Sequence, residues 1–222
     1  MAGALKLYSY WRSSASYRVR AALNLKRLPC EIVPVHLLAH GGEQHAQAYR
    51  DLNPQELVPI LLDGSRVFRQ SLAIIEYLDE AHPGAMSLLP STARDRARVR
   101  ALAQLVACDI HPLNNLRVMQ FLDREFSTPQ VERERWMRHW VVEGLRAFEA
   151  MLADNASTGL YCDGDAPTLA DVCLVPQLYN ARRAGVDVGA FPTILRIERE
   201  CLALPAFDAA RPENQPDAPP AG

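Results

Sequence analysis

The sequence predicts an α/β unit followed by an all-helical region. Over roughly the first 85 of the 222 residues, short β-type stretches alternate with helical patterns, which is typical of an α/β domain. After Pro83 the patterns are helical throughout, and 49 % hydrophobic residues suffice for one large core or two small ones. We therefore expect an α/β domain over residues 1–84 and an all-α domain over residues 91–222.

The first domain is expected to have the element order βαβ(α)ββα. Pro34 favours an edge position for the second strand, because proline donates no hydrogen bond to a neighbouring strand. Asp63-Gly64 is a strong signal for a hairpin between the last two strands. The expected elements are strands over 5–10 and 31–36, a helix over 14–26 between them, a short helix over 44–51, strands over 59–62 and 65–68, and a helix from 71 to near 82.

The second domain is expected to contain four helices. One runs from residue 92 towards 121 and bends near Pro112, which blocks one backbone hydrogen bond. Thr168 and Asp171 have the spacing of an N-terminal capping pair, which we interpret as purely structural. The Pro-rich residues 211–222 are expected to form a loosely attached tail. The other three helices are expected over 129–153, 168–185 and 193–202.

Composition excludes several classes of function. With 24 basic and 26 acidic residues the net charge is −2, which disfavours nucleic-acid and polybasic membrane-binding surfaces. No apolar run approaches the ~18–20 residues of a membrane span, and the first residues lack the pattern of a signal peptide. Five scattered cysteines without a C-x-x-C pair indicate reduced, mostly buried thiols of a cytoplasmic protein. The six histidines show no metal-binding spacing, so we expect no metal.

Ser13 and Ser14 lie where the first strand passes into a helix. They can cap the helix, and on spacing alone this is the commoner role. Alternatively, a serine hydroxyl and the helix N-terminus can stabilise a thiolate, since lowering a thiol pKa by about two units needs about 2.7 kcal/mol. No cysteine of the chain lies in this turn, so the thiol would belong to a cofactor.

Two further features fit a bound peptide. A cis bond at Val58-Pro59 would present a backbone edge to an extended peptide, although an ordinary trans proline is the commoner case. Gln70 and Ser71 open a helix whose N-terminus can hold a carboxylate, with simple capping as the alternative. Two helix N-termini and an exposed edge describe a pocket for a short, acidic, thiol-bearing peptide such as glutathione.

Several motifs then resemble the zeta class of glutathione transferases, the maleylacetoacetate isomerase family. The resemblance covers nearly the whole chain in order. The motifs are Ser13-Ser14-x-Ser16-x-Arg18-Val19-Arg20, Leu52-Asn53-Pro54 with Val58-Pro59, Gln70-Ser71-Leu72-Ala73-Ile74-Ile75-Glu76-Tyr77-Leu78, Asp109-Ile110-His111-Pro112-Leu113-Asn114-Asn115, Thr168-Leu169-Ala170-Asp171, Leu174-Val175-Pro176-Gln177 and Gln215-Pro216-Asp217.

The resemblance implies a glutathione-transferase architecture, with a thioredoxin-like N-terminal domain and an all-α C-terminal domain. It also implies glutathione as cofactor, a homodimer, a cis peptide at Val58-Pro59 and a small dicarboxylate-type substrate. Catalytic roles fall to Ser13 and Ser14 at the glutathione sulfur and to Arg12 and Arg183 at substrate carboxylates, for which the guanidinium fork is suited. Without the family, Arg183 beside Arg182 would more often be a solvated pair. Glutathione-side roles fall to Gln44, Val58, Gln70, Ser71, His111, Asn115 and Arg117.

The implied reaction is glutathione-dependent cis–trans isomerisation of maleylacetoacetate in aromatic amino-acid breakdown. Related bacterial maleylpyruvate isomerases carry two arginines after the Asn-Asn pair, where this chain has Leu116 and Arg117. Zeta enzymes usually carry Cys at the position of Ala15, so thiolate stabilisation must depend on the serines and the helix end. The alternatives are maleylpyruvate isomerisation, transfer of glutathione to small halo acids, and a non-catalytic binding module of the same fold.

Overall fold

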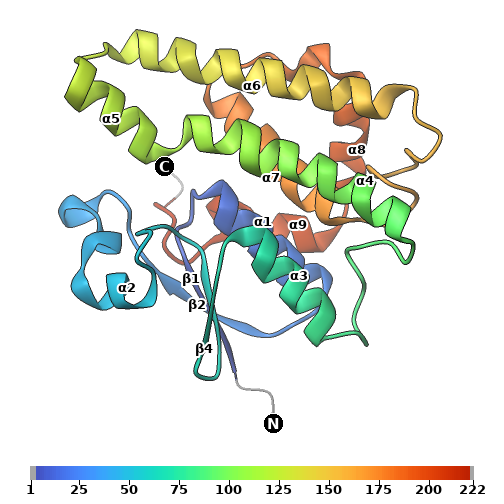
Figure 1. Ribbon diagram of the computed structural model, residues 1–222, viewed down its shortest axis with the longest axis horizontal. Coiled ribbons are helices and arrows are strands. Elements are labelled where there is room, and N and C mark those ends of the chain that lie inside the picture. The colour runs from blue at the N-terminus through green and yellow to red at the C-terminus, as the bar shows by residue number, and fades with distance from the viewer. Residues whose placement is uncertain (1–3, 221–222) are drawn as a thin grey trace. The chain divides into compact units, whose positions relative to one another are not determined.

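The computed structural model describes residues 4–220, which form two compact units (Figure 1). The first unit combines the chain up to Leu89 with the segment from Leu202 onward. The second unit is Pro90–Cys201. The structure therefore differs from the predicted domain division at the C-terminal end, where about twenty residues that we expected in the helical domain belong to the first unit.

The first unit is built on a four-stranded mixed sheet in the order β2-β1-β3-β4. β1 pairs in parallel with β2, and β3 runs antiparallel to both β1 and β4. As predicted, the strand that ends at Pro34 lies at an edge. The bounds are β1 Leu5–Ser9, α1 Ser14–Leu25, β2 Cys30–Pro34, α2 Gln47–Leu52, β3 Ile60–Asp63, β4 Arg66–Arg69 and α3 Ser71–Ala81.

Helices α1 and α3 lie side by side (Figure 1) and bury their apolar faces. At the end of α1, the fully buried Lys26 ammonium pairs with Asp79 of α3 (Nζ–Oδ1 2.9 Å) and donates to the carbonyl of Met86 (2.8 Å). The backbone N–H of Leu88 donates to the same Asp79 oxygen at 2.9 Å. One buried ion pair thus connects both helices to the segment that follows them.

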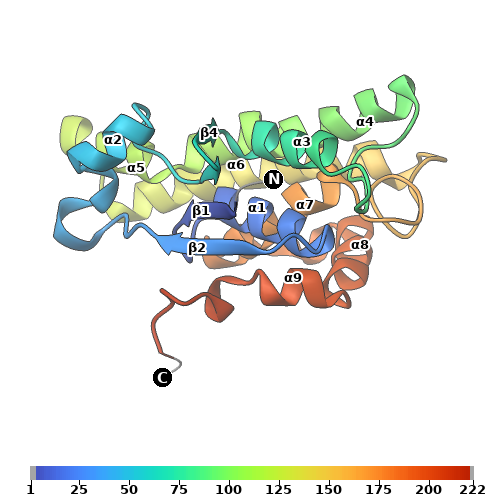
Figure 2. The ribbon, with the colours of Figure 1, turned by 90° about the horizontal axis from the view of Figure 1, so that it is seen from below.

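The C-terminal segment packs on α1 and on the turn before it. Within the predicted tail, Pro212 and Gln215 are buried and Asp217 accepts the N–H of Trp11 at 2.9 Å, so the prediction of loose attachment from residue 211 was wrong. Helix α9 (Pro205–Ala209) lies next to α1 (Figure 2). The Tyr17 hydroxyl donates to the carbonyl of Phe207 (3.1 Å), and the Asn24 amide donates to that of Ala206 (3.0 Å). The composition-based prediction failed because a high proline content does not indicate whether the backbone carbonyls of a segment accept hydrogen bonds. Buried donors on α1 need partners, and the C-terminal backbone provides them.

The second unit is helical, but the expected long helix over 92–121 is not continuous. A π-helical turn (Leu105–Ile110) and a 3-10 turn (His111–Asn114) separate α4 from α5. Pro112 lies in the 3-10 turn, and Asn115 starts a new helix as its N-cap. The helices are α4 Ala93–Gln104, α5 Leu116–Phe126, α6 Gln130–Ala153, α7 Leu169–Arg183 and α8 Pro192–Leu202.

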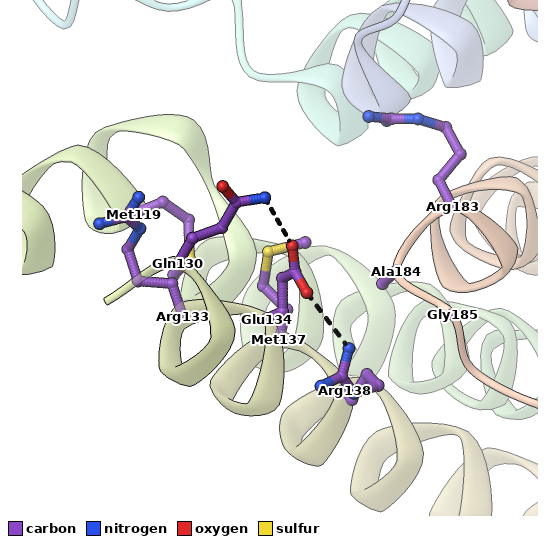
Figure 3. Close-up of a pocket in the computed structure, with 9 residues that line it drawn as sticks. All are labelled: Met119, Gln130, Arg133, Glu134, Met137, Arg138, Arg183, Ala184 and Gly185. Carbon is purple, nitrogen blue, oxygen red and sulfur yellow. Dashed lines mark hydrogen bonds and ion pairs between the residues drawn. The ribbon is translucent and has the colours of Figure 1, made fainter. Parts of the chain in front are cut away.

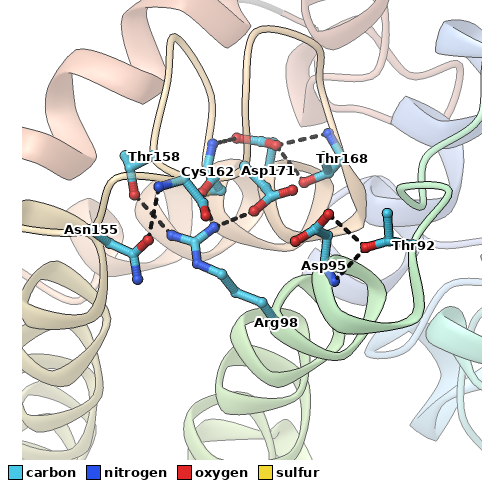
Figure 4. Close-up of polar contacts among 10 residues, drawn as sticks. Thr92, Asp95, Arg98, Asn155, Thr158, Cys162, Thr168 and Asp171 are labelled. Atoms are coloured by element: carbon cyan, nitrogen blue, oxygen red, sulfur yellow. Dashed lines mark hydrogen bonds and ion pairs between the residues drawn. The ribbon is translucent and has the colours of Figure 1, made fainter.

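Two polar clusters hold the loop before α7 in place (Figure 4). Asp171 accepts hydrogen bonds from the backbone N–H groups of Cys162 and Thr168, each 2.8 Å, which confirms the predicted capping pair. Arg98 of α4 donates to the carbonyl of Cys162 (2.7 Å) and to Thr158 (2.8 Å). The loop between α6 and α7 is thereby fixed by side chains of α4 and α7.

Candidate functional site

The turn between β1 and α1 presents Ser13 and Ser14. Ser13 is the N-cap of α1, and its Oγ accepts a hydrogen bond from the N–H of Ser16 at 3.2 Å. Because this bond uses a lone pair, the Ser13 hydroxyl hydrogen stays available for donation. Ser14 is the first residue of the helix and is buried. The capping role is thus present, and it leaves the donor function of Ser13 intact.

Arg12 precedes these serines in the same turn. Its guanidinium lies over the ring of Trp11, 5.7 Å from the ring centroid. A cation at this distance is attracted by the face of the ring. The turn therefore carries a positive side chain on the residue directly before Ser13.

Ser71 opens α3 and is connected to α1 by a buried arginine. The Ser71 Oγ accepts a hydrogen bond of 3.2 Å from Nη1 of Arg18, whose residue is only 1 % exposed. A helix N-terminus and a buried guanidinium both favour a bound anion. Gln70, which has φ 69°, is exposed, and its amide donates to Oε1 of Gln55 at 2.9 Å. The structure thus places Ser13, Ser14 and Ser71 at the starts of two adjacent helices.

The role of Arg18 was missed in the sequence. The signal that could have revealed it is its spacing, because Arg18 lies four residues after Ser14 and four before Ala22 on the buried side of α1. A charged side chain on the buried side of a helix needs a hydrogen-bond or ion-pair partner inside the protein, because burying an unpaired charge is costly. Arg20 is the second such case: it is 3 % exposed, and its burial lowers its pKa to about 10.

Gln44 lies in the loop before α2 and carries an unmatched acceptor. Its amide nitrogen donates to the carbonyl of Leu37 at 3.3 Å. Its Oε1 is buried and has no hydrogen-bond partner among the described residues. Gly42, with φ 100°, leaves room for this side chain, since a Cβ there would lie 2.6 Å from the amide nitrogen. A buried oxygen without a donor indicates a site for an N–H group of a ligand.

Val58 lies at the entrance to β3, and the Val58–Pro59 peptide is cis, as the resemblance implied. The side chain of Val58 packs on the buried cluster of Val35, Tyr49 and Ile60. The carbonyl of Leu57, just before it, accepts hydrogen bonds from the Tyr49 hydroxyl and the Asn53 amide, each 2.8 Å. The backbone edge at Val58 is therefore rigidly supported.

In the second unit, Arg183 lines a pocket of about 420 Å³ together with residues of α5 and α6 (Figure 3). Its neighbour Arg182 is engaged elsewhere, in a two-bond ion pair with Glu198 (2.5 Å each). Both arginines are exposed, but they differ because Arg182 is engaged with Glu198 whereas Arg183 lines the pocket. Figure 3 shows Arg183 on the α7 side of the pocket, across from Gln130 and Glu134 of α6. The lining residues are Met119, Gln130, Arg133, Glu134, Met137, Arg138, Arg183, Ala184 and Gly185.

His111, Asn115 and Arg117 lie on the segment between α4 and α5. His111 starts the 3-10 turn, and the Asn115 side chain caps α5 by accepting the N–H of Arg117 at 3.2 Å. Arg117 is exposed on the first turn of α5. The described residues that line the pocket do not include these three. The structure therefore gives Asn115 a capping role at the start of α5.

Comparison with known proteins identifies the family. The family model "Glutathione S-transferase, N-terminal domain" matches residues 7–86, and "Glutathione S-transferase, C-terminal domain" matches residues 130–212. The chain belongs to the glutathione S-transferase family. The predicted thioredoxin-like plus all-α architecture and the resemblance to the zeta class are thereby confirmed.

The relatives of this family member are similar over nearly their whole length. A probable maleylacetoacetate isomerase of Vibrio cholerae is 51 % identical over 96 % of this chain and 98 % of its own. A maleylpyruvate isomerase of Ralstonia sp. is 47 % identical over 96 % of this chain and 100 % of its own. The holo structure of maleyl pyruvate isomerase, a bacterial zeta-class enzyme, superposes with a TM-score of 0.93 at 46 % identity, covering 96 % of this chain and 100 % of that one.

One solved relative carries ligands. The maleylacetoacetate isomerase of Methylobacterium extorquens AM1 was crystallised with malonate and glutathione, and it matches with a TM-score of 0.91 at 43 % identity over 96 % of this chain and 99 % of that one. In this chain, the orphaned acceptor of Gln44 and the two helix N-termini at Ser13 and Ser71 fit an acidic tripeptide.

Among residues 4–220, His, Cys, Asp and Glu side chains form no group of three that could hold a metal ion. No helix in that range combines the length and apolarity needed to cross a membrane.

Proposed function

We propose that this protein is a glutathione-dependent cis–trans isomerase of maleyl-type dicarboxylic acids, with maleylacetoacetate, an intermediate of tyrosine breakdown, as substrate. The observation that carries the proposal is the turn before α1, in which Arg12 directly precedes the N-cap Ser13. One group suits a substrate carboxylate and the other suits a thiolate. Bound glutathione supplies the thiolate that adds reversibly to the conjugated double bond and so permits its rotation.

The first unit would hold glutathione. Ser71, backed by Arg18, receives a carboxylate of the tripeptide, and Gln70 lies next to it. The backbone at Val58 pairs with the extended peptide, and Oε1 of Gln44 accepts one of its N–H groups. Each role uses a group that the fold has already fixed, so little ordering is needed on binding.

Ser13 and Ser14 would ionise the thiol of glutathione in the absence of a cysteine at Ala15. A hydrogen bond to a charged acceptor is worth about 1.5–3 kcal/mol, and a helix N-terminus adds about 0.3–1 kcal/mol. The sum corresponds to a thiol pKa lowered by about one to three units, since one unit equals about 1.4 kcal/mol. This is enough to make the thiolate abundant near neutral pH.

The second unit would supply groups for the substrate. Arg183, at the edge of its pocket, pairs with a substrate carboxylate through its guanidinium fork. His111, Asn115 and Arg117 would line the approach of the substrate. Leu116, where maleylpyruvate isomerases carry an arginine, favours maleylacetoacetate over the shorter acid.

The protein would act as a cytoplasmic homodimer. All five cysteines are free thiols, as is typical of a reducing compartment. The exposed apolar side chains of Phe121, Phe126 and Val131 on α5 and α6 offer a surface for a second copy. Light scattering coupled to size-exclusion chromatography should give the mass of two chains, and a monomer at micromolar concentration would contradict the dimer.

A spectrophotometric comparison of maleylacetoacetate with maleylpyruvate, at saturating glutathione, tests the function. We expect turnover of both, with the higher kcat/KM for maleylacetoacetate. Retention on immobilised glutathione without turnover of either substrate would refute the isomerase proposal and favour a binding module. The opposite rank order would make maleylpyruvate the substrate.

Variants test the residue roles. Arg183→Ala should raise KM for the dicarboxylate at least about tenfold, because a charged hydrogen bond is lost. Arg146→Ala is the matched control, since Arg146 lies on the exposed side of α6 beside Glu143. Ser13→Ala should raise the pKa of bound glutathione by about one to two units, with Ser65→Ala at the exposed hairpin tip as control. Unchanged values in Ser13→Ala and Ser14→Ala would remove the serine role.

A further inference from the structure

The turn of residues 10–13, which carries Arg12 and Ser13, is held by groups outside itself. Within the turn, the N–H of Ser13 donates to the carbonyl of Tyr10 at 3.0 Å. The Ser13 carbonyl accepts the N–H of Tyr17 at 2.9 Å, and further hydrogen bonds to the backbone of the turn come from Arg20 and Asp217. Asp217, in the C-terminal segment, thus contacts the backbone directly before the start of α1.

The guanidinium of Arg20 donates hydrogen bonds to the backbone of the turn. Its Nη1 donates to the Oγ of Ser9 (2.9 Å) and to the carbonyl of Tyr10 (3.4 Å), and its Nη2 donates to the carbonyl of Trp11 (3.0 Å). Its Nε donates to the carbonyl of Ala210 at 3.1 Å. One buried guanidinium therefore fixes both the turn and the C-terminal segment.

Asp217 completes the arrangement from the C-terminal segment. Its Oδ2 accepts the N–H of Trp11 at 2.9 Å, across 206 positions of the chain. Its other oxygen is buried without a hydrogen-bond partner among the described residues, and its charge acts on Arg20. The backbone of Trp11 is thus held on both sides: its N–H donates to Asp217, and its carbonyl accepts from Arg20.

The segment that carries Asp217 is itself anchored. Pro212 and Gln215 are buried, and the Gln215 amide donates to the carbonyls of Ala209 (3.0 Å) and Arg211 (2.7 Å). A carboxylate on an anchored segment can impose a position on its partner, whereas one on a mobile tail cannot.

We propose that Asp217 is a positioning residue for the thiolate site: its carboxylate, acting with Arg20, holds the Trp11 peptide and thereby orients the Arg12 and Ser13 that follow. The inference rests on the proposed role of Ser13. Preorganised donors stabilise a charge without reorganisation, so a loosened turn should stabilise the thiolate less. The buried segment at the C-terminal end then contributes to glutathione ionisation without touching glutathione.

The direction of the pKa shift separates positioning from a simple charge effect. Removing the negative charge of Asp217 leaves Arg20 uncompensated, which by itself would lower the pKa of a nearby thiol. Loss of the hydrogen bond to Trp11 loosens the turn, which raises that pKa. Asp217→Asn removes the charge and keeps an oxygen acceptor for Trp11, whereas Asp217→Ala removes both.

The experiment measures the pKa of bound glutathione from the ultraviolet absorbance of the thiolate, together with hydrogen exchange of the backbone amides of residues 11–13. In Asp217→Ala we expect the pKa to rise by about half a unit or more, a roughly threefold smaller thiolate fraction at neutral pH, and amide exchange to accelerate about tenfold. In Asp217→Asn the pKa should stay level or fall. Asp208→Asn is the control, because this carboxylate lies on the same segment and is exposed.

Each result decides the inference. An unchanged or lowered pKa in Asp217→Ala, with Ser13→Ala still raising it, would overturn the inference and leave the proposed function standing. If Ser13→Ala also has no effect, the proposed thiolate site has failed, and amide exchange alone reports whether Asp217 holds the turn. Should Asp217→Ala fail to fold, Asp217→Gly and Asp217→Ser provide the same loss of the carboxylate, and normal exchange at Trp11 in either would refute the positioning role.

Discussion

The start of α7 depends on Asp171, and replacing this residue by Ala should destabilise the protein strongly. The carboxylate is fully buried and accepts three hydrogen bonds of 2.8 Å, from the N–H of Cys162 and from the N–H and hydroxyl of Thr168. In Asp171→Ala two buried N–H groups lose their acceptor, at about 1–3 kcal/mol each. Part of this is offset, because burial disfavours the charge and raises the pKa of Asp171 in spite of the bonds. We expect a net loss of about 3 kcal/mol.

The chain contains a matched control at the start of α4. Thr92 and Asp95 repeat the Thr-x-x-Asp spacing, with the Asp95 N–H donating to the Thr92 hydroxyl oxygen at 3.2 Å and that hydroxyl donating to the Asp95 carboxylate at 2.6 Å. This pair is exposed to solvent, so water replaces the lost acceptor in Asp95→Ala. We expect a loss below about 1 kcal/mol.

Thermal unfolding followed by circular dichroism measures the difference. For a chain of this size 1 kcal/mol corresponds to about 2–4 °C, so Asp171→Ala should lower Tm by about 6–12 °C and Asp95→Ala by less than about 4 °C. Equal shifts in the two variants would refute the reasoning, because they would show that burial of the capping pair does not determine its energy.

Two further predictions concern other buried contacts. Burial disfavours the charge of Asp79, but hydrogen bonds from Lys26, Leu88 and Ser87 outweigh this and lower its pKa. Such a carboxylate adds stability above its unfolded pKa of about 3.9 and loses it as pH falls through the lower folded value. Asp79→Asn should therefore cost about 3 kcal/mol at pH 7 and flatten the acid limb of the urea-midpoint curve, and an unaltered limb would contradict this. In Gly144→Ala the new Cβ would lie 2.2 Å from Ile110 Cγ1, so we expect a loss of about 1–3 kcal/mol in urea unfolding, and a stabilised variant would disprove the clash.

The elements of the first unit could be predicted because each depends on local sequence. The alternating stretch before Ser9, the turn at Asp63-Gly64 and the helix after Ser71 all follow from neighbours within a few residues. The capping pair of α7 was predictable for the same reason.

What could not be predicted depends on partners that are distant in sequence. No local pattern in the Pro-rich segment predicts the hydrogen bond from the N–H of Trp11 to Asp217. The two residues are 206 positions apart and come together only in the folded chain. Pro112 predicts a bend in one long helix, yet the helix already changes to π geometry at Leu105 and α5 is a separate helix. The substrate-binding roles of Arg12 and Arg183 follow from the family resemblance, because no local pattern separates a carboxylate-binding arginine from a solvated one.

The first unit is assembled from both ends of the polypeptide, with the helical unit in between. During synthesis, Tyr17 and Arg20 leave the ribosome long before the carbonyls of Phe207 and Ala210 that accept their hydrogen bonds. Domains that are continuous in sequence can fold as they emerge, but this one must wait for the last part of the chain. The first unit can therefore be completed only late in synthesis. A ribosome-bound chain that ends before residue 205 would contain the whole helical unit but only part of the first unit.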